Sequence, residues 1–500
     1  MVRRIEKAAV IGSGIMGGGI AALCASAGIP TVLLDIVPFD LKDEEKNDKA
    51  ARNRIVQAGF AAIAKAKPGA YMNKKVDPQL ITIGNLQDDF DLLKDCDIIF
   101  EVIVENLKIK QELFARVEKV RKPNAIIASN TSGLPLKEMG EGRSKEFKQH
   151  FVITHFFNPV RYMKLLELVT GPDVLPEVND FVYQWGEKIL GKGMVWAKDT
   201  PNFIGNRIGV ELICEAFKLI DQGIGSIVEV DAMFGKPFGM PNTAVFGLAD
   251  MVGLDTIGHL AHNSYELLPK DEYREIYKLP KFVEQMLEKK MYGTKTKDAG
   301  GFYKSGRTPE GKKFKQVLDP KSMNFVDYDR KASYPIVDET KGKKTLGEKQ
   351  QVLVNGNQFA YKLIASMVIY SANRVPEIAD SIVEIDNAMK WGYAWEAGPF
   401  EIWDNLGLEA FTKKMKGDGY KIPAAVETML SKGAKSFYKV EGGKKMFWDL
   451  VKAEYKPVKY SSNMIFLDNL KADKKEVKGN ASASLIDLGD GVFNIEFHTK

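Results

Sequence analysis

The stretch that most restricts the possible folds is residues 7–35, KAAVIGSGIMGGGIAALCASAGIPTVLLD. A short apolar run enters Gly12, Gly14 and Gly17, small residues with helical periodicity follow, and a second apolar run ends in Asp35. This order predicts a strand, a glycine turn, a helix and another strand. In such a unit the first glycine permits a tight turn, the second lets the backbone approach a pyrophosphate, and the third lets the helix pack closely on the strand. The phosphate charge would then meet free N–H groups at the helix N-terminus.

Asp35 indicates which dinucleotide such a turn would bind. A carboxylate at the end of the second strand accepts hydrogen bonds from both ribose hydroxyls and repels a 2′-phosphate, so we expect NAD rather than NADP. A glycine turn alone is weak evidence, but here the strand, the helix and the acidic residue agree. The cofactor contacts predicted in the turn itself are Gly12, Gly14, Ile15, Met16 and Gly17.

Length and charge exclude several other classes of protein. A chain of 500 residues is too long for one hydrophobic core, so we expect more than one domain. Its 71 Lys and Arg against 66 Asp and Glu give a net charge of +5, too dilute to indicate binding to nucleic acid or a membrane surface. No apolar stretch is long enough to span a bilayer, so we predict a soluble, cytoplasmic protein without membrane insertion.

The cysteines and histidines do not suggest a metal site. Cys24, Cys96 and Cys214 lie far apart with no CxxC pattern, and we expect them to be reduced and buried. His259 and His262 would share one helical face, but no third ligand accompanies them.

Further strands are predicted after the first pair, in QLITIG, CDIIFEVIVE and NAIIASNTS. Ligands in doubly wound sheets gather at the carboxyl ends of strands, so Glu105, Asn106 and the residues of 129–132 should face the cofactor crevice. Taken alone, SNTS could equally be a helix cap or a turn. Residues 43–75 are interpreted as a charged helical insertion that an ordinary Rossmann unit would not need.

A titratable pair lies in the segment HFFNPVRYMKLLELV, residues 155–169. The pattern predicts the end of a strand, a turn at Asn158 and Pro159, and a second strand that runs antiparallel and brings Glu167 towards His155. A carboxylate on one ring nitrogen fixes the tautomer and leaves the other nitrogen free as a base. For an isolated pair, a structural histidine in the core is the more common outcome. Its expected place beside an NAD crevice favours proton transfer coupled to hydride transfer.

Five motifs together resemble one enzyme family. IGSGIMGGGIA, VENLKIKQELF, SNTSGLP, HFFNPVRYMKLLELV and DTPNFIGNR occur in the order, and at nearly the spacings, of L-3-hydroxyacyl-CoA dehydrogenases, and the resemblance covers residues 5 to about 455. It implies an α/β Rossmann-type NAD-binding domain followed by two repeated all-α domains. It also implies NAD-dependent oxidation of (S)-3-hydroxyacyl-CoA to 3-oxoacyl-CoA in fatty acid β-oxidation.

The resemblance carries residue roles with it. The family's catalytic histidine falls on His155 and its orienting glutamate on Glu167, while its active-site serine and asparagine fall on Ser132 and Asn206. The family's cofactor contacts fall on Asp35, Glu105, Lys110, Ser132 and Asn158, and Asn130, at the end of its strand, is also expected to contact the cofactor. Two positions depart from the family pattern: Asn202 stands where a glycine is usual, and Gly205 stands where a bulkier residue is usual. Relatives contact coenzyme A in the region of residues 43–75, but no particular residue there can be assigned.

The remainder of the chain contains an internal repeat. DTPNFIGNR opens a helical domain, with Asp199 or Thr200 as the expected cap and Pro201 near the first turn. SIVEVDAMFG, from residue 226, is similar to SIVEIDNAMK, from residue 381. Two copies could pack as two subunits would, so either a monomer or a homodimer is consistent with the sequence. The expected domains are 1–198, 199–300 and 350–455, with a surface linker at 301–349 and a further segment at 456–500.

The last residues, ASASLIDLGDGVFNIEFHTK, predict two short strands around a Gly-Asp-Gly turn. They resemble the opening hairpin of the crotonase, or enoyl-CoA hydratase, fold. We therefore expect a fusion to a hydratase domain beyond residue 500. Two other functions stay open from the sequence: a dehydrogenase of small β-hydroxyacids, and a non-catalytic NAD-binding fragment of a bifunctional protein.

Overall fold

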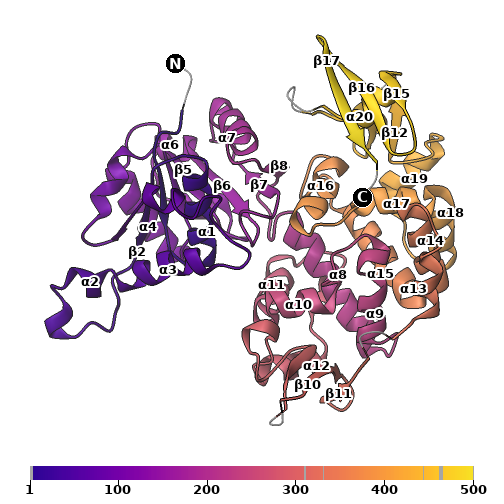
Figure 1. Cartoon of the computed structure of the whole chain (residues 1–500), viewed down its shortest axis with the longest axis horizontal. Coiled ribbons are helices and arrows are strands. Elements are labelled where there is room, and N and C mark those ends of the chain that lie inside the picture. The colour runs from indigo at the N-terminus through magenta and orange to yellow at the C-terminus, as the bar shows by residue number, and fades with distance from the viewer. Residues whose placement is uncertain (1–3, 309–310, 330–331, 443, 461–464, 499–500) are drawn as a thin grey trace.

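The computed structural model describes residues 4–308, 311–329, 332–442, 444–460 and 465–498. A sheet domain formed by the N-terminal residues lies beside a larger, mainly helical part (Figure 1). None of the helices in these ranges is both long enough and apolar enough to cross a membrane. Cys24, Cys96 and Cys214 are free and buried, as predicted.

The N-terminal domain is built on one eight-stranded sheet with the order β3-β2-β1-β4-β5-β6-β7-β8. Its strands are β1 (Ala8–Ile11), β2 (Thr31–Asp35), β3 (Ile81–Asn85), β4 (Ile98–Glu101), β5 (Ile126–Ser129), β6 (Phe151–Phe156), β7 (Leu165–Val169) and β8 (Gly193–Ala197). Neighbouring strands from β3 to β6 are parallel. β7 runs antiparallel to β6 and parallel to β8. The predicted doubly wound sheet is confirmed, and its parallel strands carry the polar residues that end them to one edge.

Helices cover the sheet and connect its strands. They are α1 (Ile15–Ser26), α2 (Lys49–Arg52), α3 (Arg54–Lys65), α4 (Leu107–Val120), α5 (Leu136–Met139), α6 (Lys145–Gln149) and α7 (Pro176–Lys188), with short 3-10 turns η1 (Asp43–Glu45), η2 (Asp77–Leu80) and η3 (Phe90–Asp95).

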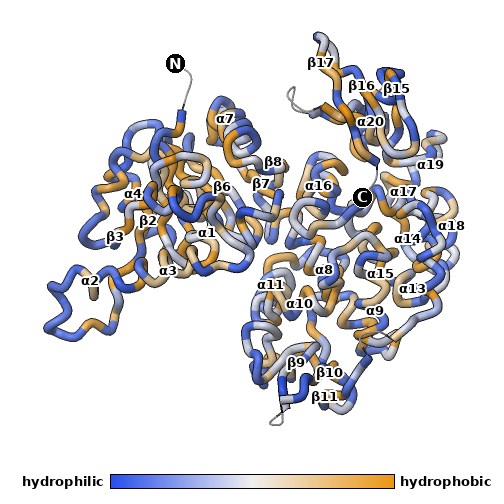
Figure 2. Tube along the Cα trace, in the orientation of Figure 1, coloured by the Kyte–Doolittle hydropathy of each residue, from blue (hydrophilic) through white to orange (hydrophobic). Residues whose placement is uncertain are grey.

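The structure corrects the interpretation of residues 43–75 as an insertion. α3 lies in the connection between the parallel strands β2 and β3, a connection that needs a crossover element. Ile63 of α3 is buried, and a Cβ placed on Gly18 of α1 would lie 2.9 Å from its side chain. α3 therefore belongs to the Rossmann layer. Only the loop around α2 projects from it, and that loop is largely hydrophilic (Figure 2).

Two similar helical units follow the sheet domain. The first contains α8 (Gly205–Asp221), α9 (Ile227–Met233), η4 (Lys236–Phe238), α10 (Phe246–Val252), α11 (Leu254–Leu267), η5 (Arg274–Tyr277), α12 (Lys281–Glu288), η6 (Gly293–Lys295) and a sheet of β9 (Tyr303–Arg307), β10 (Lys313–Asp319) and β11 (Asn324–Asp327). The second contains α13 (Pro335–Thr340), α14 (Leu346–Gly356), α15 (Gln358–Asn373), α16 (Ile382–Gly392), α17 (Pro399–Leu406), α18 (Leu408–Gly417), α19 (Ala424–Ser431) and a sheet of β12 (Tyr438–Glu441), β13 (Lys444–Asp449) and β14 (Glu454–Pro457).

The predicted repeat is visible in the polar contacts of the two units. Ser226 caps α9, and Ser381 caps α16 at the corresponding place. The two long helices α8 and α15 pack against each other, so each unit covers an apolar face of the other. In a chain with two units, this apolar face is therefore buried within one molecule.

Residues 301–349 are not the surface linker that composition suggests. They form β9–β11, α13 and the start of α14, and Phe302, Val317 and Leu318 are buried in the first unit. The second unit likewise extends to Pro457, past the expected boundary at 455. The strands in this stretch are rich in lysine and have few buried positions, so their apolar and polar residues do not alternate clearly. For this reason they could not be predicted from the sequence pattern.

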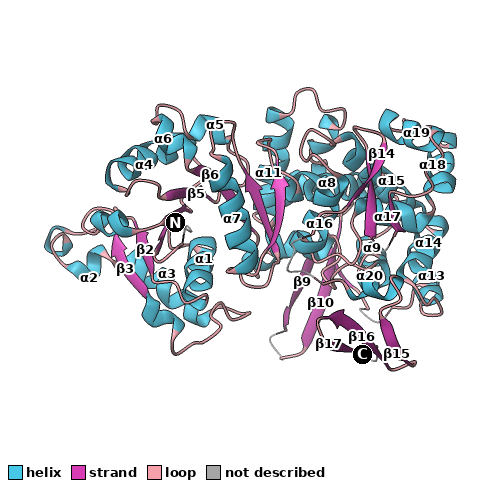
Figure 3. Ribbon diagram, turned by 90° about the horizontal axis from the view of Figure 1, so that it is seen from above, coloured by secondary structure: helices cyan, strands magenta, loops and turns pink. Residues whose placement is uncertain are grey.

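The final segment contains α20 (Leu467–Ala472), β15 (Glu476–Gly479), β16 (Ala483–Gly489) and β17 (Val492–Phe497). β16 and β17 are the two predicted strands, and β15 adds a third to the sheet. This sheet lies at the periphery of the helical part, as Figures 1 and 3 show from two directions (Figure 3). Val477, Val492, Phe493, Ile495 and Phe497 are exposed on it.

Candidate active site

His155 and Glu167 lie opposite each other on two antiparallel strands. The register of β6 and β7 pairs these two residues directly, and the His155 Nδ1 atom is 2.5 Å from the Glu167 Oε2 atom. The predicted return of the chain after Asn158 is confirmed. His155 is 5% exposed and Glu167 is fully buried, so the carboxylate has no water to compete with the imidazole. Among the described residues, His155 Nε2 has no hydrogen-bond partner, which leaves it available to a ligand.

The second oxygen of Glu167 caps α8. The backbone N–H groups of Ile204 and Gly205 donate to Oε1 over 3.0 and 2.7 Å. The expected cap was wrong: α8 begins at Gly205, and the Asp199 carboxylate instead accepts from the backbone N–H of Leu136, at the start of α5. A long-range carboxylate has replaced the local cap because Glu167 is held at this helix end by β7.

Aromatic rings surround the histidine. The ring of His155 lies 4.7 Å from that of Phe157 and 5.6 Å from that of Phe203, measured between centroids. A Cβ on Gly205 would lie 2.7 Å from Phe157, so the glycine found here allows α8 to approach this ring. Tyr393, which follows α16 in the second helical unit, packs on Phe157 at 6.3 Å.

The other departure from the family pattern also has a structural explanation. Asn202 has a φ of +65°, in the left-handed region that favours glycine and, among the other residues, asparagine. Its buried side chain donates to Ser264 Oγ over 2.7 Å, which compensates for the conformational cost. The backbone shape that a glycine would give is therefore available to this chain with asparagine.

The glycine turn forms an open cradle at the start of α1. Gly12 has a φ of +107°, and a Cβ on Gly17 would lie 1.9 Å from the Gly12 carbonyl oxygen, so both positions are fixed by the protein itself. Gly14 is different, because no atom lies within 4 Å of a Cβ built there. No side chain among the residues that the structure describes caps α1, and Ile15 is 80% exposed. The N–H groups of this helix end are free to meet an anion, and the residues fit a bound pyrophosphate.

Asp35 lies at the end of β2 beside this cradle. Its Oδ2 accepts hydrogen bonds from the backbone N–H and the hydroxyl of Ser13, each over 2.6 Å. The carboxylate is thus held at the edge of the turn, where the sequence placed it.

A charged cluster follows β4 and β5. Lys110 is buried, and its Nζ atom lies 2.7 Å from Glu101 Oε1 and 3.2 Å from Glu105 Oε2. Glu105 in turn accepts from the Thr131 hydroxyl and from the Ser132 backbone N–H. The predicted residues Glu105, Lys110 and Ser132 are therefore brought together, with the lysine behind the carboxylate.

The remaining predicted residues are four asparagines, which lie in different surroundings. Asn130 Oδ1 accepts from the backbone N–H of Phe156, next to His155. Asn158 is exposed in the loop after β6, and Asn206 is partly buried in the first turn of α8. The Asn106 side chain caps α4 by accepting from Ile109 N–H.

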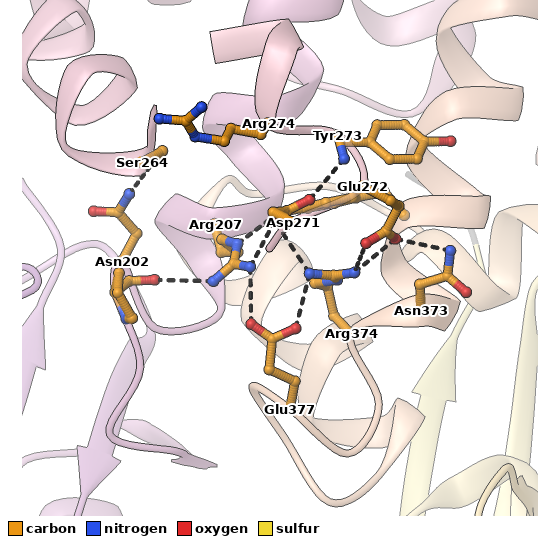
Figure 4. Close-up of polar contacts among 12 residues, drawn as sticks. Asn202, Arg207, Ser264, Asp271, Glu272, Tyr273, Arg274, Asn373, Arg374 and Glu377 are labelled. Atoms are coloured by element: carbon orange, nitrogen blue, oxygen red, sulfur yellow. Dashed lines mark hydrogen bonds and ion pairs between the residues drawn. The ribbon is translucent and has the colours of Figure 1, made fainter. Parts of the chain in front are cut away.

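The start of α8 is anchored to the second helical unit by a polar network in which Arg207, Asp271 and Arg374 are buried (Figure 4). Arg207, next to Asn206, pairs with Asp271 at 2.7 Å and with Glu377 at 2.9 Å. Arg374 pairs with the same two carboxylates. The network holds the helix that carries Asn206 and whose first N–H groups hold Glu167, and no sequence motif indicated it.

Comparison with known proteins identifies the two parts of this arrangement. A family model described as "3-hydroxyacyl-CoA dehydrogenase, NAD binding domain" matches residues 7–200. A second, "3-hydroxyacyl-CoA dehydrogenase, C-terminal domain", matches residues 203–305.

Three curated proteins are similar over long stretches. The "Probable 3-hydroxyacyl-CoA dehydrogenase" of Bacillus subtilis is 42% identical over an alignment 510 positions long, which covers 100% of this chain and 63% of that protein. A protein of the same name from Deinococcus radiodurans is 42% identical over 60% of this chain and 83% of its own length. A "Putative fatty acid oxidation complex trifunctional enzyme" of Rickettsia felis is 40% identical over 80% of this chain and 53% of its own length. The chain thus spans between half and two thirds of the longer relatives.

A solved structure shares the fold over most of the chain. The 3-hydroxybutyryl-CoA dehydrogenase of Escherichia coli K12 has a TM-score of 0.63 at 18% identity, and the match covers 87% of this chain and 100% of that one.

Proposed function

The chain belongs to the 3-hydroxyacyl-CoA dehydrogenase family, and we propose that it oxidises (S)-3-hydroxyacyl-CoA to 3-oxoacyl-CoA with NAD. The observation that carries the proposal is the His155–Glu167 pair, whose free imidazole nitrogen lies at the same edge of the sheet as the open glycine cradle. A base and a dinucleotide cradle at one edge are what alcohol oxidation requires.

His155 acts as the general base. Its Nε2 atom takes the proton of the 3-hydroxyl group, while the hydrogen on C3 leaves with its electron pair and the C3–O bond becomes a ketone. NAD, when bound, supplies the acceptor for that hydride. Glu167 holds the Nδ1 hydrogen, which fixes the tautomer and stabilises the imidazolium that forms.

Ser132 and Asn206 bind the polar groups of the substrate. Ser132 follows β5 and Asn206 lies in the first turn of α8, and contact between these segments supports a common site, since a Cβ on Gly133 would lie 3.2 Å from Asn202 N. Hydrogen bonds from these side chains to the 3-oxygen and the thioester carbonyl would stabilise the partial negative charge on these oxygens as the ketone forms.

The turn and the cluster behind it hold the cofactor. Gly12, Gly14, Ile15, Met16 and Gly17 receive the pyrophosphate, and Asp35 accepts from the ribose hydroxyls in place of Ser13. Glu105, Asn130, Ser132 and Asn158 contact the remainder of the dinucleotide. Lys110 acts through Glu105, because its own ammonium group is buried.

The partner we propose is an enoyl-CoA hydratase activity on the same polypeptide. Two relatives that are longer than this chain, from Rickettsia, carry the name of a putative trifunctional enzyme of a fatty acid oxidation complex, which supports the suggestion made by residues 483–497. A hydratase would supply the 3-hydroxyacyl-CoA that the dehydrogenase consumes.

The proposal is tested by NADH formation at 340 nm with 3-hydroxyacyl-CoA substrates of increasing acyl length. We expect turnover with NAD, little with NADP, and loss of turnover in His155→Gln with NAD affinity retained. A protein that binds NAD but oxidises no acyl-CoA of any length would contradict the proposal. Turnover with free 3-hydroxybutyrate, unaffected by coenzyme A as a competitor, would indicate a dehydrogenase of small hydroxyacids instead.

A further inference from the structure

A large cavity lies in the first helical unit, separate from the residues around His155. Its volume is about 920 Å³, and it opens between α9, α10 and the strands β9 and β10. These elements lie in the lower region of Figure 1, whereas β6 and β7 belong to the sheet domain. Four lysines line the cavity: Lys236, Lys297, Lys304 and Lys315.

Two carboxylates also face the cavity, but the protein already satisfies them. Asp231 accepts from the backbone N–H groups of residues 245–247 and from the Tyr303 hydroxyl, at distances between 2.8 and 3.1 Å. Asp250 accepts from the N–H groups of Phe302 and Tyr303, each over 2.8 Å. Because these carboxylates already accept hydrogen bonds from the protein, they are poor ion-pair partners for the lysines at the rim of the cavity.

The internal repeat provides a second copy of the same place. Tyr438 donates to Asp386 over 2.7 Å, as Tyr303 donates to Asp231 over 2.8 Å. Asp404 accepts from the N–H groups of Phe437 and Tyr438, as Asp250 does from their counterparts. The two frameworks therefore correspond residue by residue.

In the second copy the corresponding positions carry an ion cluster. Glu401 follows Phe400, and its Oε1 atom lies 2.8 Å from Lys390 Nζ and 3.1 Å from Lys445 Nζ. The first copy has glycine at two of these positions: Gly247 follows Phe246, and Gly235 lies four residues after Asp231, as Lys390 does after Asp386. Both glycines line the cavity.

The third member of the cluster is a lysine in both copies. Lys315 precedes Asp319 in β10 by the same interval as Lys445 precedes Asp449 in β13. The turns that follow agree too, since Met323 and Ala453 have φ values of +56° and +52°. Lys445 forms an ion pair with the Glu401 carboxylate, whereas Lys315 has no ion pair within the part of the chain that the structure describes.

We propose that this cavity binds a small organic polyanion, one of whose phosphate or carboxylate groups takes the place that the Glu401 carboxylate occupies in the second unit. Lys315 contacts that group, and the other three lysines balance further negative charge. The space is much larger than one carboxylate needs, so the ligand has a body as well, which would lie against Tyr328 and Tyr334.

The test is isothermal titration of the full chain, saturated with NAD so that the dinucleotide site is occupied, with three probes. The probes are ADP, inorganic pyrophosphate and citrate. ADP and pyrophosphate test phosphate ligands, and citrate tests carboxylate ligands. Comparison of ADP with pyrophosphate shows whether the organic part of the ligand contributes to binding. We expect at least one probe to bind. Lys315→Gln should weaken its affinity at least about tenfold, and Gly247→Glu, which restores the second unit's acid, should abolish binding. Lys413→Gln, an exposed lysine of α18 in the second unit, should leave the affinity unchanged.

Two results would overturn the proposal. One is the absence of binding by all three probes at millimolar concentration. The other is binding that both Lys315→Gln and Gly247→Glu leave unchanged, because such a site lies elsewhere in the molecule. Should Gly247→Glu lower the melting temperature, Lys315→Gln alone decides. Neither residue touches the dehydrogenase site, so oxidation of acyl-CoA should be equal in all variants and reports separately on the proposed function.

Discussion

His155 and the start of α8 are held by one carboxylate, that of Glu167. Its Oε2 atom lies 2.5 Å from His155 Nδ1, while its Oε1 atom accepts the N–H groups of Ile204 and Gly205. The residue that orients the base therefore also helps to join the sheet domain to the helical part. A displacement of α8 would move the carboxylate and, with it, the imidazole.

This double use predicts the outcome of Glu167→Gln. An amide has one acceptor oxygen, and the two helix N–H groups require it, so the amide N–H₂ group would face His155 Nδ1. The imidazole would then carry its hydrogen on Nε2 and could not act as a base. We expect kcat to fall by about 10²–10⁴-fold with little change in NAD affinity.

Nitrogen-15 NMR of the histidine ring checks this explanation, because it distinguishes the two tautomers. The conservative variant Glu167→Asp, which retains both acceptors, serves as the comparison. Wild-type turnover in Glu167→Gln would show that His155 is not the base.

The glycine turn offers a matched pair of substitutions. Gly14→Ala meets no protein atom within 4 Å, so the free energy of unfolding should change little, while the methyl group would obstruct a pyrophosphate. We expect NAD affinity to fall at least about tenfold, a loss of about 1.4 kcal/mol. Gly17→Ala would place its Cβ 1.9 Å from the Gly12 carbonyl oxygen and should destabilise the domain itself. Fluorescence titration with NAD and thermal unfolding separate the two effects, and equal loss of stability in both variants would contradict the assignment of Gly14 to the ligand.

The sequence predicted the parts of this molecule that depend on local pattern. Glycine spacing, apolar runs and the turn at Asn158 were enough to place β1, α1, β6 and β7, because each depends on neighbours in the chain. The repeat from residue 381 was equally visible, since Ser381 and Asp386 keep their spacing.

Contacts between distant residues could not be predicted in this way. Glu167 replaces Asp199 as the cap of α8 only because β7 carries it there, and the residues of β9–β11 become strands only by pairing with each other. The crossover role of α3 was missed for a related reason. The charged residues 43–54 at and before its start dominate the pattern, while the contact of α3 with α1 depends on Ile63 and a glycine of the other helix.

The network at the start of α8 should contribute to stability. The Tyr370 hydroxyl accepts from Arg207 Nε over 2.5 Å and lies 2.8 Å from Asp271 Oδ2 and 2.7 Å from the Tyr277 hydroxyl. Tyr370→Phe leaves these buried groups one partner short, which should cost about 1–3 kcal/mol in the free energy of unfolding. Urea unfolding measures this cost, with Tyr162→Phe as the control, because Tyr162 is 51% exposed. An unchanged midpoint would mean that the network does not anchor α8.

The interface between α8 and α15 should make stability depend on pH through Glu211. Burial raises the pKa of Glu211 to about 8, although the Ser366 hydroxyl, which donates to Oε1 over 2.6 Å, opposes the rise. Glu215 and Asp271 add to the rise in pKa, and Lys218 opposes it. The ordinary pKa is 4.5, so between pH 4.5 and about 8 the folded state binds the proton more tightly than the unfolded state does. The free energy of unfolding must therefore fall as pH rises through this window.

Glu211→Gln removes this titration and keeps an acceptor for Ser366. The variant should match the wild type near pH 4.5 and exceed it at pH 8.5, by on the order of 2–4 kcal/mol. Urea unfolding at the two pH values measures the difference, and Glu409→Gln, whose side chain is 75% exposed, should show none. A Glu211→Gln variant that is less stable than the wild type at pH 8.5 would show that the buried carboxylate is ionised and paired, because only then does its charge contribute to the interface.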